Sequence, residues 1–235
     1  MPRKPSASHR LLTAARWPAG LALTAWAYMW RTTPMHRRET DGKWPKDAPP
    51  PVTADVDLTE VQRVEDGVGP FLRRRYRAVI RDARASPKAM MREIQADPNI
   101  VVPNGLAHFT KVLGREGEMR VGDEFSVRMP GPWDGPVRVV DRTPRSFRFA
   151  TLDGHIEAGQ IEWRARRDDG DVIFEIQSWS RPGDRLSHVL HHRLRMAKEV
   201  QLHMWTSVLE RVVRRYGGRR KGPLDIETRR IDVGG

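Results

Sequence analysis

The fold is decided by Phe147-Arg-Phe-Ala-Thr-Leu-Asp-Gly-His-Ile-Glu-Ala-Gly-Gln-Ile-Glu-Trp163 and, after a short gap, by Val172-Ile-Phe-Glu-Ile-Gln-Ser-Trp-Ser180. Apolar and polar residues alternate in these stretches, which is the period of a strand with one wet face. Glycines 154 and 159 indicate a turn between the first two strands. A long amphipathic pattern follows. We therefore expect an α+β fold, in which a curved antiparallel sheet grips a C-terminal helix and encloses an apolar pocket.

Shorter alternating runs precede this region and predict strands at about 76–80, 106–113, 125–129 and 137–139. A helix is expected from Pro87 to about Ala96, because Ser86 can cap it and proline suits a first turn. The faces opposite the apolar ones carry charged or amide side chains that we expect to pair across strands. These are Arg128, Arg138, Arg148, Glu162, Arg164, Glu175 and Gln177.

From Leu186 to about Tyr216 the apolar period changes to 3.6, which predicts a helix roughly 45 Å long. Trp205 belongs to its apolar stripe and Thr206 to the opposite, polar face. Gln201 interrupts the apolar stripe. Because a buried amide needs partners, Gln201 is expected to bond either the sheet backbone or a ligand.

Residues 11–31 are apolar and aromatic, interrupted by Arg16 and Pro18, with basic residues on both sides. Aromatic residues and basic flanks suit a membrane interface, so we predict a membrane-associated helix, interfacial or a tilted span, with the main domain in the cytoplasm. A signal peptide and a helix packed on the main domain are the alternatives.

The chain divides by composition into four parts. Residues 1–40 form the basic, apolar N-terminal segment, and residues 41–59 are expected to be a proline-rich, semi-rigid linker. The predicted helix-grip domain spans residues 60–216. Residues 217–235 are expected to be a loose basic tail rich in glycine and arginine.

The formal net charge of +12 raises the question of nucleic acid. Half of this excess lies in residues 1–50, which carry nine basic and three acidic residues, so a nucleic-acid partner is not favoured. The chain has no cysteine, which excludes disulfides, thiolate catalysis and thiolate metal ligands.

The run Thr151-Leu-Asp-Gly-His-Ile-Glu-Ala-Gly159, with Phe174-Glu-Ile176 and Ser178-Trp-Ser180, resembles the family called domain of unknown function nineteen-ninety. Residues 129–136 and 197–205 resemble its actinobacterial branch. The resemblance covers about residues 65–215. It implies a START-like, helix-grip fold related to polyketide-cyclase-like and lipid-transfer proteins, and it implies no established activity.

His155 and Glu157 are the candidate catalytic pair, because an imidazole beside a carboxylate can do acid–base work. The alternatives are ligand contact or a polar turn that bonds its own backbone. No nucleophile occurs in a recognisable motif beside them, and no cofactor is predicted. His188 and His192, with Glu199, have a spacing that could hold a metal, but a solvated helix face is expected there.

The leading functional prediction is a non-enzymatic protein that binds a lipid or another apolar small molecule and is held at a membrane surface through residues 11–31. A cyclase- or hydrolase-like enzyme using His155 and Glu157, and a membrane-tethered interaction module, are the alternatives. An interior void of about 300 Å³ or more favours ligand binding. The predicted pocket residues are Trp133, Phe149, Thr151, Trp163, Phe174, Ser178, Gln201 and Trp205.

Overall fold

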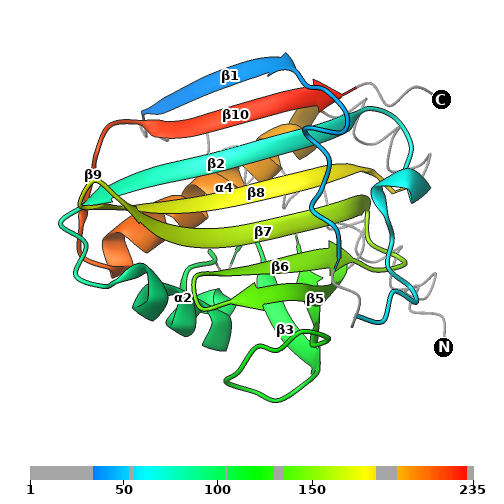
Figure 1. Ribbon diagram of the computed structural model, residues 1–235, viewed down its shortest axis with the longest axis horizontal. Helices are drawn as coiled ribbons and strands as arrows, with labels where there is room; N and C mark the ends of the chain where they lie inside the picture. The colour runs from blue at the N-terminus through cyan, green and yellow to red at the C-terminus, as the bar shows by residue number, and fades with distance from the viewer. Residues whose placement is uncertain (1–33, 53–55, 104, 130–134, 184–194, 232–235) are drawn as a thin grey trace.

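The structure is a computed structural model that describes residues 34–52, 56–103, 105–129, 135–183 and 195–231, with the backbone alone for 195–200. Within these residues the chain is α+β, as predicted. One open, curved sheet packs against two helices, α2 (Pro87–Ala96) and α4 (Arg195–Arg215) (Figure 1). Two short 3-10 turns, η1 (Val64–Asp66) and η2 (Pro98–Ile100), complete the elements.

The sheet has ten strands in the order β1-β10-β2-β8-β7-β6-β5-β4-β3, and β9 pairs with β2 beside this path. Each neighbouring pair is antiparallel except β1 with β10, which is parallel and departs from the purely antiparallel sheet that we predicted. The bounds are β1 Met35–Asp41, β2 Phe71–Arg81, β3 His108–Leu113, β4 Glu124–Arg128, β5 Gly135–Thr143, β6 Ser146–Thr151, β7 Glu157–Asp168, β8 Asp171–Pro182, β9 Arg219–Arg220 and β10 Leu224–Ile231.

The central strands and α2 lie where the sequence predicted them. Ser86 caps α2, since its Oγ accepts a hydrogen bond from the Ala89 amide at 3.2 Å, and Pro87 occupies the first turn. β6, β7 and β8 carry their predicted apolar residues on one face, where Phe149, Trp163 and Phe174 are at most 1% exposed.

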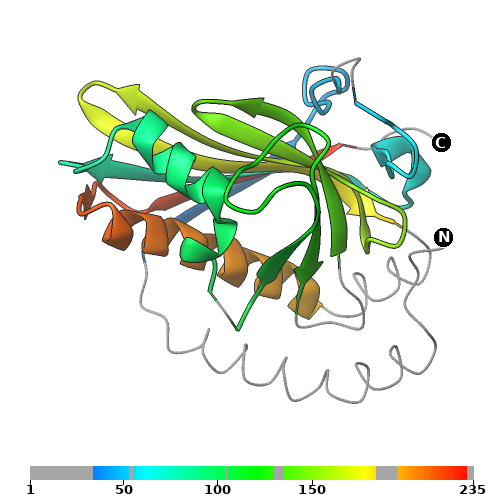
Figure 2. The same ribbon diagram turned by 90° about the horizontal axis from the view of Figure 1, so that it is seen from below.

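The core lies between the concave face of the sheet and the two helices, which Figure 2 shows on the same side of the sheet. Trp205 of α4 is 7% exposed, and its ring centroid lies 5.9 Å from that of Trp163. The predicted helix thus presents its apolar stripe to the sheet. Each buried aromatic contributes about 1.5–3 kcal/mol through removal of apolar surface from water. Leu186–Leu194, the first part of the predicted helix, lies outside the described residues.

The prediction of a polar face at Thr206 is wrong, because this residue is fully buried. Its hydroxyl donates to the Leu202 carbonyl at 2.8 Å, which satisfies it inside the helix. The segment after α2 also reaches α4, since Arg211 Nη1 donates to the Val102 carbonyl at 2.8 Å. The amphipathic pattern within the helix sequence does not reveal contacts with distant parts of the chain.

The described part of the tail that was predicted to be loose instead forms strands β9 and β10. β10 lies between β1 and β2, and Leu224 and Ile226 are buried in the core cluster. Leu224 and Ile226 alternate with Asp225 and Glu227, which is a strand pattern. Because arginines are frequent on both sides of this short run, the sequence was interpreted as a loose tail. The predicted membrane-associated segment, residues 11–31, lies outside the described residues. No helix in the described part of the chain has the length and apolarity to cross a membrane.

The chain before β2 crosses the outer, convex face of the sheet, in front of the strands in Figure 1. We call residues 42–52 and 56–64 the strap. Arg148 Nη2 donates to the Pro51 carbonyl at 2.9 Å, and Arg138 Nη1 to the Thr59 carbonyl at 2.9 Å. The predicted cross-strand pairs are present at Arg138 with Glu124 (2.6 Å) and at Arg164 with Glu175 (2.7 Å). Arg148 also pairs across strands, since its Nη2 lies 3.9 Å from the carboxylate of Asp141 on β5, and it holds the strap through the Pro51 carbonyl as well.

Candidate functional site

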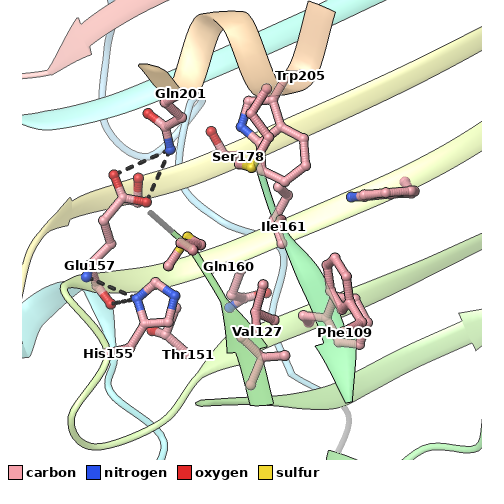
Figure 3. Close-up of a pocket in the computed structure, with 17 residues that line it drawn as sticks. Phe109, Val127, Thr151, His155, Glu157, Gln160, Ile161, Ser178, Gln201 and Trp205 are labelled. Atoms are coloured by element: carbon pink, nitrogen blue, oxygen red, sulfur yellow. Dashed lines mark hydrogen bonds between the residues drawn. The ribbon is translucent and has the colours of Figure 1, made fainter. Parts of the chain in front are cut away.

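A cavity of about 80 Å³ lies between the concave face of the sheet and the first described side chains of α4 (Figure 3), and we call it the inner cavity. Side chains from β3, β4 and β5 form one wall and those of β6, β7 and β8 the floor. The lining residues are Ala107, Phe109, Val127, Met129, Val137, Phe149, Thr151, His155, Glu157, Gln160, Ile161, Trp163, Ser178, Ser180, Gln201, Met204 and Trp205.

The body of this inner cavity is aromatic. Phe109 stacks on Phe149 with ring centroids 5.8 Å apart, and Phe109 also meets Trp163 edge to face at 6.3 Å. Alternation along the strands puts these rings on the concave face, and such offset and edge-to-face pairs stabilise aromatic clusters beyond their buried area. The cavity therefore has rigid, apolar walls.

Four buried hydrogen-bonding atoms of the lining residues have no partner. Three can donate, namely the indole nitrogens of Trp163 and Trp205 and the hydroxyl of Ser178, and the fourth is the acceptor Oε1 of Gln160. In Figure 3 the indole nitrogen of Trp205 lies on the side of Ser178. A buried polar group without a partner costs about 1–3 kcal/mol. Such groups in a native structure mark a place where water or a ligand supplies the missing partner.

A chain of polar side chains forms one end of the cavity. Gln201 Nε2 donates to the Glu157 carboxylate at 3.2 and 3.4 Å, and Arg74 donates to Gln201 Oε1. Arg74 lies directly across from Ser178 in the pairing of β2 with β8. The pKa of Tyr76 is raised, chiefly by burial, and Tyr76 stays neutral near this cluster. Gln201 was expected to bond either the sheet backbone or a ligand. In the structure its amide bonds the side chains of Glu157 and Arg74 instead of the sheet backbone.

His155 is bound by its own hairpin. Its Nδ1 lies 2.9 Å from the Glu157 amide nitrogen and 3.0 Å from the Glu157 carbonyl oxygen, so the backbone occupies this nitrogen in either tautomer. The ring packs on Gly135, where a Cβ would lie 2.7 Å from ring atoms. Burial lowers the pKa of His155, against the opposing effect of Glu157, and the imidazole is neutral at pH 7.

The described residues around His155 do not form a nucleophile–base arrangement. Among the described residues, no hydroxyl group is hydrogen-bonded to His155, so a serine-type nucleophile is not assembled there. Likewise, no group of three or more metal-ligating side chains occurs in the part of the chain that the structure describes. His188 and His192 lie outside that part, as does the side chain of Glu199.

The predicted pocket residues Phe149, Thr151, Trp163, Ser178, Gln201 and Trp205 all border the inner cavity. Phe174 is fully buried in the core but does not line it, and Trp133 lies outside the described residues. The sequence reading missed Phe109, Val127, Met204 and the nearby Arg74. Arg74 lies an even number of residues from Tyr76 and Ile80 on β2, so its side chain is on the same face of the strand as theirs. A cation among inward-facing apolar positions was the feature of the sequence that could have revealed it.

Fold and site together define a class of α+β proteins, in which a curved sheet and a C-terminal helix enclose a small aromatic cavity with a polar end. Residues 107–217 match the model of a family described as "Domain of unknown function (DUF1990)". The resemblance to this family found in the sequence is confirmed for residues 107–217, which run from just before β3 to just after α4. The match begins after β2 and α2, which the resemblance had included.

No curated protein matches the chain. Solved structures that resemble it include the KanY protein, with 11% identity over 61% of this chain and 96% of that chain and a TM-score of 0.44. Protein Ms6760 from Mycobacterium smegmatis shows 16% identity over 59% and 88%, with a TM-score of 0.37. A hypothetical protein of Helicobacter pylori, jhp0584, shows 10% identity over 60% and 86%, with a TM-score of 0.43. Likeness at this level assigns no function.

Proposed function

We propose that the protein is a binding protein of the START-like, helix-grip kind, which holds a small, mostly apolar molecule with an acceptor oxygen in the inner cavity. The observation that carries the proposal is the set of unpartnered donors, Trp163 Nε1, Trp205 Nε1 and Ser178 Oγ, in a cavity whose body is aromatic. An oxygen that accepts from them removes a cost of about 1–3 kcal/mol for each group that it satisfies.

The size of the inner cavity limits the ligand. About 80 Å³ is room for several water molecules. It lies well below the roughly 300 Å³ at which drug-sized ligand pockets begin. A long acyl chain does not fit within this volume. Of the two ligand classes expected from the sequence, a lipid or another apolar small molecule, we therefore propose the second, in the form of a compact ring or short branched molecule. Carbonyl and ether oxygens are the acceptors of choice, because they add no charge to an apolar site.

The enzymatic alternative finds less support in this geometry. Acid–base catalysis at His155 needs a ring nitrogen that reaches the substrate, but Nδ1 is held by the Glu157 backbone and the ring edge that carries Nε2 lies against Gly135. Glu157 serves as a hydrogen-bond partner of Gln201. Attachment to a membrane surface through residues 11–31 stays a prediction, which membrane fractionation of the full chain and of a chain lacking residues 1–33 would test.

Ligand-observed saturation-transfer NMR with cyclohexanone and methylenecyclohexane tests the proposal. The two probes have nearly the same shape, but only the ketone has an acceptor oxygen. We expect the ketone to bind about fivefold or more tightly than the hydrocarbon, because a single satisfied donor adds about 1 kcal/mol. Val127→Phe, which fills the inner cavity, should abolish both signals. Signals that persist unchanged in a folded Val127→Phe protein would place the binding elsewhere and refute the proposal.

A further inference from the structure

A second and larger cavity lies on the opposite face of the sheet. It has a volume of about 310 Å³ and is enclosed by the strap, the start of η1 and the outer face of β7. The lining residues are Trp44, Ala48, Pro49, Pro50, Pro51, Val52, Leu58, Val61, Gln62, Arg63, Val64, Glu65, Gly159 and Gln160. We call it the outer cavity. Its volume reaches the lower end of the range of small-molecule sites.

The outer cavity persists because the strap is held at both ends. On one side Asp47, 1% exposed, pairs with Arg73 at 2.5 Å and with Arg229 at 3.1 Å. On the other side Val61 forms an isolated antiparallel β-bridge with Leu152, and the backbone N–H of Gln62 donates to the Thr151 carbonyl at 2.8 Å. Three consecutive prolines between these anchors fix their φ angles and resist collapse onto the sheet.

The walls of the outer cavity are mainly apolar. Trp44 stands at one side and is itself held by an edge-to-face contact with Phe71, with ring centroids 6.0 Å apart. The prolines of the strap, Leu58 and Val61 supply most of the remaining surface. The two charged residues in the lining, Arg63 and Glu65, are exposed and of opposite sign. An uncharged, apolar body therefore suits this cavity.

The polar specificity of the outer cavity comes from Gln160 on its floor. The Oε1 atom of Gln160 is buried and has no hydrogen-bond partner. Leaving it so costs about 1–3 kcal/mol, which a ligand recovers if it brings an N–H or O–H group. A carboxamide also carries an N–H₂ group, so a ligand amide can pair with it through two hydrogen bonds.

We propose that the outer cavity is a second binding site, for an uncharged molecule that combines an aromatic or aliphatic body with a hydrogen-bond donor of the amide type. The body lies against Trp44 and the strap prolines, and the donor reaches Gln160. This site does not depend on the inner cavity being a ligand site. The two cavities lie on opposite faces of β7, where Gln160 borders both.

Benzamide and acetophenone are the probes for this proposal, because they differ in one group, an N–H₂ donor in place of a methyl. Titrations by saturation-transfer NMR should show that benzamide binds the full chain about fivefold more tightly than acetophenone. Gln160→Leu should remove this preference while acetophenone still binds. Ala48→Phe, which fills the outer cavity, should abolish both signals, whereas Val127→Phe, which fills the inner cavity, should leave them unchanged.

Each contrary outcome is decisive when thermal melting shows that the variant is folded. Benzamide binding that survives Ala48→Phe but is lost in Val127→Phe would place the probe in the inner cavity and overturn the proposal. Equal affinities of the two probes for the unmodified chain would overturn the role of Gln160. An absence of binding by either probe at millimolar concentration would overturn the site itself. Cyclohexanone binding to the inner cavity is tested independently through Val127→Phe. A failure of the outer site can therefore be told apart from a failure of the proposed function.

Discussion

At the scale of single residues, two buried serines differ in a way that connects stability to binding. Ser178 is 3% exposed and its hydroxyl has no partner, whereas Ser146 is 7% exposed and its hydroxyl lies 2.7 Å from that of Thr143. Both belong to the same sheet and lose the same atom on replacement by alanine. The difference between them isolates the hydrogen bond from the change in volume.

We predict that Ser178→Ala leaves the free energy of unfolding unchanged or raises it slightly, because an unsatisfied buried hydroxyl is removed. Ser146→Ala, the matched control, should lower it by about 1 kcal/mol through loss of a satisfied bond. Urea unfolding followed by tryptophan fluorescence measures both. An equal loss in the two variants would show that Ser178 has a partner after all.

A second residue-scale prediction concerns His155. Since burial lowers its pKa, the folded protein resists protonation that the unfolded chain accepts at its ordinary pKa of about 6.5. Stability is thus fully present above that value and falls as the pH drops toward the lower folded pKa. We expect His155→Gln to weaken the loss of stability between pH 7 and pH 5 in urea titrations. An unchanged slope would mean that His155 does not titrate differently on folding.

At the scale of elements, the strands β6 to β8 could be predicted because their alternation is strong and local. Trp163 and Ser178 followed from parity alone, and both border the inner cavity. β10 was missed because a strand at the sheet periphery can carry arginines on its wet face. The contact of the strap with the sheet was not predicted, because a run of prolines occurs both in free linkers and in segments that lie against a domain. What holds this one is Asp47, whose partner Arg229 lies 182 residues away.

The ion pair of Arg138 with Glu124 on the outer face of the sheet leads to a prediction about the strap. Arg138 is 6% exposed, bonds Glu124 twice, and donates to the carbonyls of Asp57 and Thr59. We predict that Arg138→Met destabilises the protein by about 3–5 kcal/mol, because it leaves Glu124 buried without its cation and releases the strap. The exposed Arg128 on β4 is the control, and Arg128→Met should change stability by less than about 0.5 kcal/mol.

Denaturant midpoints measure this effect, and limited proteolysis reports on the strap separately. Cleavage within residues 42–64 should speed up in Arg138→Met and not in Arg128→Met. Replacing both charges, by Arg138→Met with Glu124→Leu, should recover part of the lost stability, since no uncompensated charge stays buried. A double variant as unstable as Arg138→Met alone would assign the loss to the strap contacts and not to the ion pair.

At the scale of the whole molecule, one carboxylate joins three distant parts of the chain. Asp47 in the strap bonds Arg73 of β2 and Arg229 of β10, and it also accepts from the Lys43 amide at 2.9 Å. Burial alone would raise the pKa of Asp47, but the hydrogen bonds and the two guanidinium groups outweigh it, and its pKa is lowered. Because the chain carries a formal charge of +12, each carboxylate that stays ionised also limits repulsion among the cations.

The sign of the acid response follows from this lowered pKa. The unfolded chain takes up a proton near the usual aspartate value of about 3.9, whereas the folded protein does so only at lower pH. The stability that Asp47 contributes is therefore present above pH 4 and is lost as the pH falls through its folded pKa. We predict that Asp47→Asn lowers the free energy of unfolding by about 1–3 kcal/mol at pH 7 and flattens its dependence on pH below 4. Asp153→Asn, an exposed carboxylate in the turn between β6 and β7, is the control and should change the free energy of unfolding at pH 7 by less than about 0.5 kcal/mol. If the Asp47 variant keeps the full acid slope, this carboxylate does not hold strap, sheet and C-terminal strand together, and the outer cavity must owe its shape to the remaining anchors.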